Sequence, residues 1–190
     1  MDVPVEPLRW RRLKRCEDTM VRDEIEAELQ RLHADSFGWA LVCCGRNHSE
    51  AEEILQVVYV KVLDGSARFS AKASFRTWLF GVIRRTALHQ RRKFAVRNRL
   101  LGLLMMEPVT SDIKRPDALL EGDARSQHLN HCLGRLSSRQ SDMLQLVYYH
   151  EMTIEQAAKV LNISLGSART HYTRGKVNLA RLLKEAEGER

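Results

Sequence analysis

Residues 153–176, TIEQAAKVLNISLGSARTHYTRGK, contain the clearest structural signal in the chain, because they predict two short helices joined by a corner. Thr153 is followed by Gln156 at the spacing of a capping box, so we expect the first helix to begin at Ile154. Asn162 then forms a tight corner. Two short helices, a brief turn and a small residue where the helices cross are typical of a helix-turn-helix.

The second predicted helix, which Ser164 can cap, has two chemically different sides. Its inner side carries small and apolar residues: Ala168, Tyr172, Gly175, Leu179 and Leu182. Its outer side carries basic and hydroxyl residues: Arg169, Thr170, Thr173 and Arg174. Between Glu155 and Glu185 the chain has six Lys or Arg residues and no acid. Such a face can reach phosphates and base edges in a major groove, whereas the alternative is a helical hairpin with a solvated basic face.

Charge is unevenly distributed along the 190 residues. The net charge of +7 favours a polyanionic partner. Residues 21–64 hold nine acids and four bases, but residues 65–106 hold ten bases and no acid. This segregation indicates two faces that serve two different partners. Hydrophobic content of 44% and charged content of 29% are typical of a globular protein.

Several functional classes find no support in the sequence. It has no run of eighteen apolar residues and no apolar signal peptide, so we expect a cytoplasmic protein without direct membrane insertion. Four cysteines are too few and too irregularly spaced for a disulfide scaffold. A metal site could recruit His48, or His128, His131 and Cys132, but no second close pair completes four ligands, so we predict no metal and no cofactor. Enzyme signatures are missing, and we predict no catalysis.

Helical periodicity recurs along the whole chain, and no stretch alternates as a strand does. The predicted helices before the helix-turn-helix are residues 22–44, 49–63 (with Ser49 and Glu52 as a capping box), 75–94, 117–136 and 138–149 (with Ser137 and Gln140 as a capping box). We therefore predict an all-α fold of two small helical domains joined by a flexible linker. The boundaries are 1–21 for an N-terminal extension, 22–96 for the first domain, 97–116 for the linker and 117–190 for the second domain.

Two further surfaces are predicted in the first domain. The segment 69–93 combines aromatic residues with arginines and no acid, a composition that holds single-stranded nucleic acid by stacking bases while cations follow the backbone. The alternative is that Phe75, Trp78 and Phe80 are core residues and only the arginines contact DNA. The acidic helix 49–63 is unsuited to DNA and favours a protein partner with basic groups, although plain packing would explain its apolar residues.

The order of these parts resembles a known family. SEAEEILQVVYVKVL, then FSAKASFRTWLFGVIRRTALHQRRK, then LSSRQSDMLQLVYYHEMTIEQAAKVLNISLGSARTHYTRGKVNLARLL resemble a bacterial sigma-70 family RNA polymerase sigma factor of the extracytoplasmic-function (ECF) group. The first domain resembles sigma region 2 and the second resembles region 4. The chain departs from the usual pattern at Val57, where the family often has an acid, and at Arg85 and His89, where it often has Asn and Asp.

The resemblance implies three sets of site residues. Core polymerase would bind through its β′ clamp helices to Glu52, Glu53, Ile54 and Gln56. The −10 promoter element, as a separated strand, would contact Phe69, Arg76, Trp78, Arg84, Arg85, Arg91, Arg92 and Lys93. The −35 element, as duplex DNA, would contact Ser167, Arg169, Thr170, Thr173 and Arg174.

The implied function is promoter-specific transcription initiation in partnership with core RNA polymerase, including its β subunit, and promoter DNA. The resemblance also implies an anti-sigma factor, possibly membrane-bound, in a stress, envelope or metal response. The alternative is a free-standing helix-turn-helix regulator that binds duplex operator DNA. The acid-free aromatic segment separates these hypotheses, because a repressor has no use for a strand-opening surface.

Overall fold

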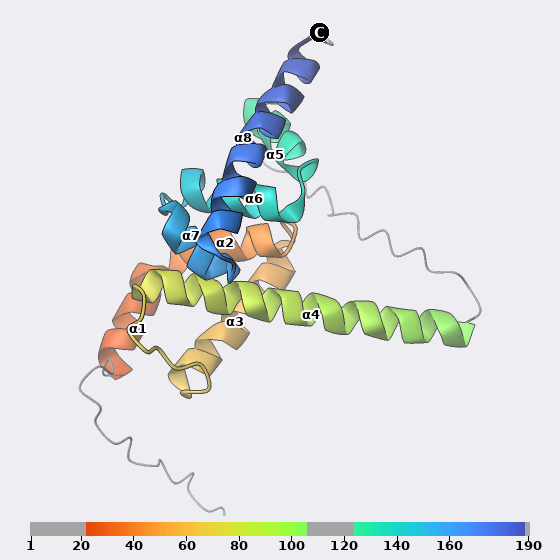
Figure 1. Cartoon of the computed structure of the whole chain (residues 1–190). Coiled ribbons are helices and arrows are strands. Elements are labelled where there is room, and N and C mark those ends of the chain that lie inside the picture. The colour runs from red at the N-terminus through yellow and green to blue at the C-terminus, as the bar shows by residue number, and fades with distance from the viewer. Residues whose placement is uncertain (1–21, 106–123, 189–190) are drawn as a thin grey trace, which may run out of the picture.

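The computed structural model describes residues 22–105 and 124–188, and all regular structure in these ranges is helical (Figure 1). The first domain contains α1 (Arg22–Arg31), α2 (His33–Cys43), α3 (His48–Leu63) and α4 (Phe75–Met105). The second contains α5 (Ala124–Gly134), α6 (Ser138–Leu144), the π-helical turn η1 (Gln145–Tyr149), α7 (Ile154–Leu161) and α8 (Leu165–Gly188). The predicted all-α class is confirmed. The N-terminal extension lies outside the described residues.

The first domain differs from its sequence prediction at two helix boundaries. The single helix expected over residues 22–44 is divided at Leu32 into α1 and α2, and both parts pack on α3. Leu32 is itself buried, so the break places an apolar side chain in the core. The capping box predicted at Ser49 is wrong, because the cap lies two residues earlier, at Asn47, and α3 begins at His48. The Asn47 side chain accepts a hydrogen bond from the Glu50 backbone N–H at 3.1 Å.

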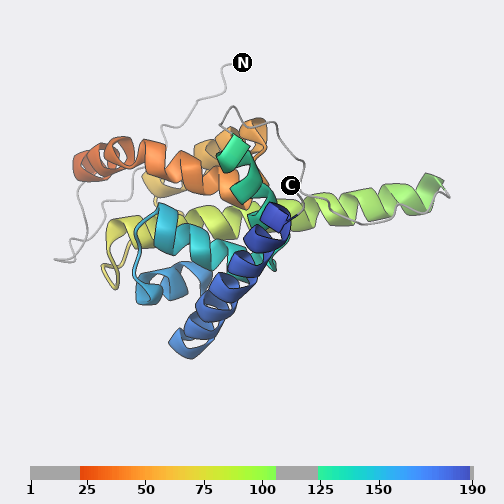
Figure 2. The ribbon, with the colours of Figure 1, turned by 90° about the horizontal axis from the view of Figure 1, so that it is seen from above.

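Helix α4 continues past the first domain. It runs to Met105, so residues 97–105 of the predicted linker are helical, and this end of α4 projects beyond the other helices (Figures 1 and 2). Between Phe75 and Pro108 the sequence has no proline to stop the helix. The remainder of the predicted linker, together with residues 117–123 of the helix expected to follow it, lies outside the described residues.

The helix-turn-helix is built as predicted. The Thr153 hydroxyl accepts from the Gln156 N–H at 3.2 Å, and the Gln156 side chain accepts from the Thr153 N–H at 2.9 Å. Asn162 takes the left-handed conformation at the corner, and Ser164 caps α8 by accepting from the Ser167 N–H at 3.2 Å. The corner is therefore fixed by the backbone conformation of Asn162 and by hydrogen bonds between residues close in the sequence.

A glycine and a hydrogen bond explain how α6 and α8 come together. A Cβ added at Gly175 would lie 3.3 Å from the Leu144 side chain, so glycine permits the close approach of the two helices. The capping box predicted at Ser137 is wrong, because Ser137 makes no side-chain cap bond. Its expected partner, Gln140, instead accepts a hydrogen bond from the Asn178 amide of α8 at 3.2 Å.

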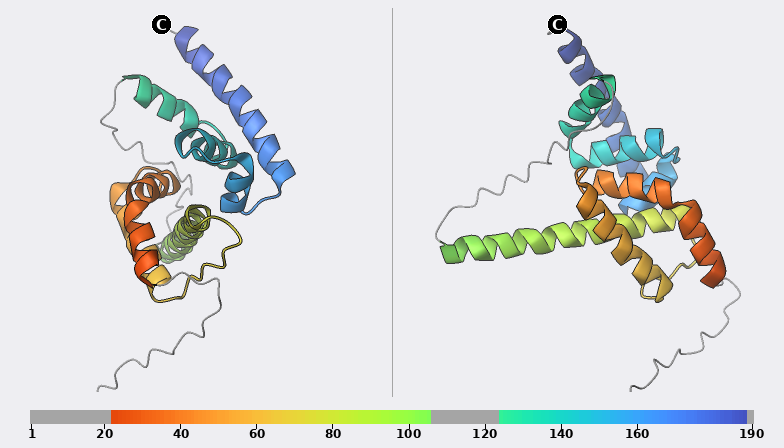
Figure 3. Two further views of the ribbon diagram at one scale, coloured as in Figure 1. Left: turned by 90° about the vertical axis from the view of Figure 1, so that its left-hand side faces the viewer. Right: turned by 180° about the vertical axis from the view of Figure 1, so that it is seen from behind.

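The two domains share one hydrophobic core, and they lie side by side in Figure 3. Trp39 of α2 stacks on Phe80 of α4, and its indole N–H donates to the Phe80 carbonyl at 3.0 Å. His150, at the end of η1 in the second domain, meets both rings edge-on at 5.8 and 5.0 Å. Helix α7 packs across α4, where Gly81 faces the Val160 backbone. The sequence alone did not predict this contact between domains.

Candidate nucleic-acid and protein interfaces

The outer face of α8 gathers the residues predicted to read duplex DNA. All five are exposed on the first turns of the helix: Ser167, Arg169, Thr170, Thr173 and Arg174. The Thr170 hydroxyl donates back to the Gly166 carbonyl at 3.0 Å, so its oxygen can still accept a hydrogen bond. Lys176, which the sequence prediction did not include, lies 4.8 Å over the Tyr172 ring on the adjoining side and adds a third cation.

Helix α3 presents an acidic face with an apolar residue at its end. Glu52, Glu53 and Gln56 are exposed, and Glu53 accepts a hydrogen bond from the Gln90 amide of α4 at 2.7 Å. Ile54 is only 2% exposed and lies in the hydrophobic core beneath this face. Val60 is 61% exposed, one helical turn beyond Gln56. Sequence reasoning missed Val60 because a valine in an apolar helix is expected to be buried.

The aromatic residues of the acid-free segment pack mainly against one another. Phe69 lies 5.4 Å from both Phe75 and Trp78, and Phe75 lies 5.2 Å from Trp78. Phe75 is buried, whereas Phe69 and Trp78 are half-buried. Phe80 is fully buried as well. The core alternative is therefore correct for Phe75 and Phe80, and Phe69 and Trp78 retain surface for a ligand.

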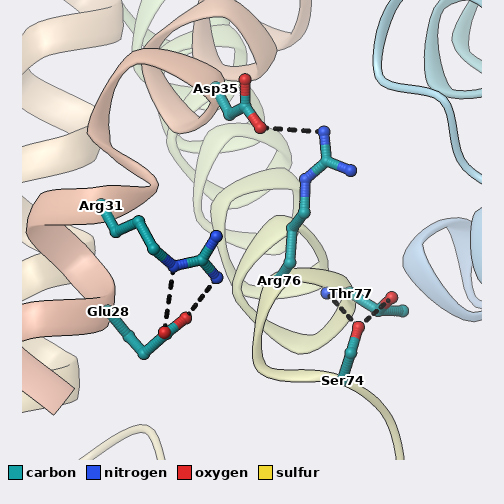
Figure 4. Close-up of polar contacts among 6 residues, drawn as sticks. All are labelled: Glu28, Arg31, Asp35, Ser74, Arg76 and Thr77. Atoms are coloured by element: carbon teal, nitrogen blue, oxygen red, sulfur yellow. Dashed lines mark hydrogen bonds and ion pairs between the residues drawn. The ribbon is translucent and has the colours of Figure 1, made fainter. Parts of the chain in front are cut away.

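Two of the arginines predicted to bind the −10 strand form ion pairs within the chain. Figure 4 shows Arg76 reaching from α4 to Asp35 of α2, with an ion pair of 2.9 Å, and its guanidinium also lies 5.3 Å over the Phe80 ring. Arg84 forms an ion pair of 3.1 Å with Asp142 of α6, and these side chains are only 12% and 10% exposed. Arg84 therefore joins the two domains.

The other cations of this segment remain available at the surface. Arg85, Arg92 and Lys93 are exposed, and Arg91 is half-buried. These four residues follow one another along α4. The helix is capped at its N-terminus by Ser74, whose hydroxyl accepts a hydrogen bond from the Thr77 N–H at 3.3 Å (Figure 4). The structure thus divides the cations of the predicted −10 set into four that remain at the surface and two arginines paired with carboxylates.

Two of the residues considered for metal binding lie close together. Cys132 Sγ lies 3.8 Å from His128 Nε2. Within residues 22–105 and 124–188, no group of three His, Cys, Asp or Glu side chains is arranged to hold a metal ion. Burial raises the pKa of the Cys44 thiol to about 11, with Glu50 adding to the effect, so this cysteine stays protonated at neutral pH.

Two family models match the chain in the order of its two domains. Sigma-70 region 2 matches residues 29–96, which contain α2, α3 and most of α4. Sigma-70, region 4 matches residues 126–179, which contain the helix-turn-helix. The chain belongs to the sigma-70 family. The resemblance seen in the sequence is confirmed.

Relatives of this sigma factor include members of the ECF group. It is 28% identical over 142 residues to the RNA polymerase sigma factor YlaC of Bacillus subtilis, covering 74% of this chain and 82% of the relative. It is also 28% identical over 136 residues to the ECF RNA polymerase sigma factor SigX of B. subtilis, covering 68% and 69%. Sigma factors are transcription initiation factors rather than catalysts, and initiation is the function of this chain. The alternative of a free-standing regulator is not favoured.

Solved structures support the fold of this sigma factor. The sigma factor RpoE from Bartonella quintana, in complex with the anti-sigma factor NepR, gives a TM-score of 0.61 at 21% identity, covering 86% of this chain and 98% of that one. CnrH, in complex with the cytosolic domain of CnrY, gives 0.58 at 18% identity, covering 87% and 90%. None of the helices in the described ranges is long and apolar enough to cross a membrane.

Proposed function

We propose that this sigma factor binds core RNA polymerase through the acidic face of α3 and promoter DNA through two separate cationic surfaces. The observation that carries the proposal is the division of charge between exposed faces. Helix α3 offers Glu52 and Glu53, whereas the outer face of α8 offers Arg169 and Arg174 without an acid among them. A positively charged protein surface complements the first face, and DNA phosphates and base edges complement the second.

Promoter opening tests the proposal as a whole. The full chain would be added to purified core polymerase and a library of promoter fragments, and strand opening would be followed by permanganate reactivity of unpaired thymines. Opening at defined fragments, dependent on both proteins, is the expected result. A chain that binds duplex fragments equally well without core polymerase, and opens none of them with it, would contradict the proposal.

Glu53→Lys is expected to weaken binding to core polymerase by at least about tenfold, because it places a cation on the face that we assign to a basic partner. Binding of the labelled full chain to core polymerase would be measured by fluorescence anisotropy. The control is Glu151→Lys, which makes the same change of charge at an exposed position of the second domain. Equal affinities for the wild type and both variants would remove α3 from the core-binding surface.

Arg174→Ala is expected to weaken binding of a −35 duplex by about 1–3 kcal/mol if the guanidinium contacts a base edge. Competition with duplexes of altered sequence, at fixed salt, gives the measurement. A base contact predicts that the loss is confined to the preferred sequence. An equal loss on every duplex would instead assign Arg174 to a phosphate, and unchanged binding would exclude it from the interface.

The −10 strand is proposed to bind the exposed cations of α4, with Trp78 and Phe69 offering aromatic surface for bases. Arg84 can join them only after its ion pair with Asp142 is broken. Binding of the melted strand therefore favours separation of the two domains. This link follows because one guanidinium cannot serve the carboxylate and a phosphate with the same geometry.

An anti-sigma factor is proposed as the regulatory partner, since RpoE and CnrH, which share this fold, were solved with NepR and with the cytosolic domain of CnrY. A protein that favours the packed arrangement of the two domains would keep Arg84 from DNA. Its expected effect is to suppress promoter opening by the wild type.

A further inference from the structure

A basic hollow of about 780 Å³ lies between the two domains. The loop after α3 and the middle of α4 form one side, and α6 and the end of α7 form the other. Six cationic side chains line it: Lys61, Arg68, Arg84, Arg85, Arg92 and Arg139. None of the described residues that line it carries a carboxylate. We refer to it as the interdomain hollow.

The positive charge of the interdomain hollow is largely unbalanced. Arg84 is paired with Asp142, but the other five cations form no ion pair with any carboxylate of residues 22–105 and 124–188. Like charges gathered around one concave surface repel one another and concentrate the local positive potential. A ligand with several negative charges would relieve this repulsion, and arginine forks bind phosphate groups through two parallel hydrogen bonds.

Apolar side chains also line the interdomain hollow. Val82, Leu88 and Leu161 line it together with the half-buried Trp78. An aromatic ring beside cations suits a planar base, because bases stack on aromatic side chains while the cations hold phosphate. The volume falls within the range of small-molecule sites. The volume of the hollow, its positive charge and its apolar lining together match a nucleotide carrying more than one phosphate.

We propose that the packed chain binds a nucleoside polyphosphate in the interdomain hollow and that this ligand holds the two domains together. Arg139 and Asn162 belong to the second domain, whereas Arg85 and Arg92 belong to the first, so one ligand would bridge both. A ligand that binds only the packed state shifts the population toward it. The regulatory consequence rests on the proposed function, because Arg84, Arg85 and Arg92 are also assigned to the −10 strand.

A short single strand of DNA is the competing occupant. Its proposed contacts lie on the first domain alone, and the second-domain side of the hollow contributes nothing that such a strand requires. Arg139 therefore separates the two cases. A bridging nucleotide needs its guanidinium, whereas a strand bound along α4 does not.

The test uses the full chain and isothermal titration calorimetry with ATP and with inorganic tripolyphosphate, at constant ionic strength and without divalent cations. ATP is expected to bind more tightly than tripolyphosphate, because only ATP can stack on Trp78. Arg139→Gln is expected to raise the Kd for ATP by about tenfold, the loss of one charge-assisted contact. The control Lys184→Gln removes an exposed cation of α8 outside the hollow and is expected to leave the Kd unchanged.

Three results would overturn the proposal. The first is an equal Kd for the Arg139→Gln and Lys184→Gln variants. The second is a heat of binding that sulfate reproduces at the same ionic strength. The third is a single-stranded oligonucleotide that displaces ATP and binds the wild type and Arg139→Gln equally. Promoter opening without nucleotides tests the proposed function independently, so opening without ATP binding would reject the nucleotide site alone.

Discussion

Asp142→Ala is expected to lower the free energy of unfolding by about 3–5 kcal/mol, because it leaves the Arg84 guanidinium buried without its carboxylate. Both Nε and Nη2 of Arg84 approach Asp142 Oδ2, at 3.4 and 3.1 Å, between α4 of one domain and α6 of the other. The two side chains are only 12% and 10% exposed, so little solvent surrounds the charge that the substitution leaves unpaired. Urea denaturation at pH 7, followed by circular dichroism, measures the change.

An exposed ion pair supplies the control for this loss. Glu28 binds Arg31 through two hydrogen bonds of 2.6 and 3.0 Å, shown in Figure 4, and the bond to Arg31 holds the pKa of the Glu28 carboxyl below its usual range. Glu28→Ala is nevertheless expected to cost at most about 1 kcal/mol, since solvent screens exposed pairs. A cost for Asp142→Ala no larger than that for Glu28→Ala would contradict a buried pair between the domains.

Replacing both Arg84 and Asp142 shows whether the loss of stability comes from the lost attraction or from a buried charge left unpaired. Arg84→Met together with Asp142→Leu is expected to be far less destabilising than Asp142→Ala alone, because no buried charge remains. Such a result would mean that the ion pair specifies how the domains meet more than it stabilises them. Since Arg84 is also proposed for the −10 strand, the pair makes the packed chain and the DNA-bound chain alternatives.

Local chemistry explains which parts of this structure can be predicted from sequence. The corner at Asn162 and the caps at Thr153 and Ser164 each involve residues within a few positions of one another, so their spacing is visible in the chain. The two faces of α8 follow from helical periodicity in the same way. The all-α class and the family resemblance rest on many such signals in order.

The failures concern interactions between distant residues. Trp39, Phe80 and His150 meet in one cluster, but nothing near any of them in sequence predicts the other two. The ion pair between Arg84 and Asp142 could not be predicted either, because the two residues are far apart in the sequence. Arg84 was therefore predicted as a DNA contact without an intramolecular partner. The break between α1 and α2 at Leu32 has no glycine or proline nearby that would predict it. We attribute the break to the packing of both helices on α3.

His150 is expected to make the packed structure less stable in mild acid. The residue is 1% exposed, and neither ring nitrogen has a hydrogen-bond partner among the described residues. Burial lowers the pKa of the imidazole from 6.5 to about 4; the Arg76 guanidinium acts in the same direction, and the Asp35 carboxylate opposes it. We therefore expect the free energy of unfolding to fall by about 2 kcal/mol between pH 7 and pH 5.

The sign follows from which state binds the proton. In the folded chain the ring stays neutral down to about pH 4, whereas in the unfolded chain it is protonated below its ordinary pKa of 6.5. Between these values the unfolded state binds more protons, so stability is complete above pH 6.5 and is lost as the pH falls toward 4. The pKa values of the Glu28 and Asp64 carboxyls are held below 4.5 and 3.8, so these groups contribute at lower pH.

His150→Leu is expected to abolish the fall between pH 7 and pH 5, and His89→Leu, at an exposed position of α4, is expected to retain it. Urea denaturation at both pH values measures the two differences. At pH 7 the His150→Leu variant should lose no more than about 1 kcal/mol, because removing an unpartnered buried polar ring offsets part of the lost packing. A fall in the His150→Leu variant equal to that of the wild type would show that the ring is protonated within the packed domains. The contact of His150 with Trp39 and Phe80 would then be compatible with charge, and acid would not separate the domains through this residue.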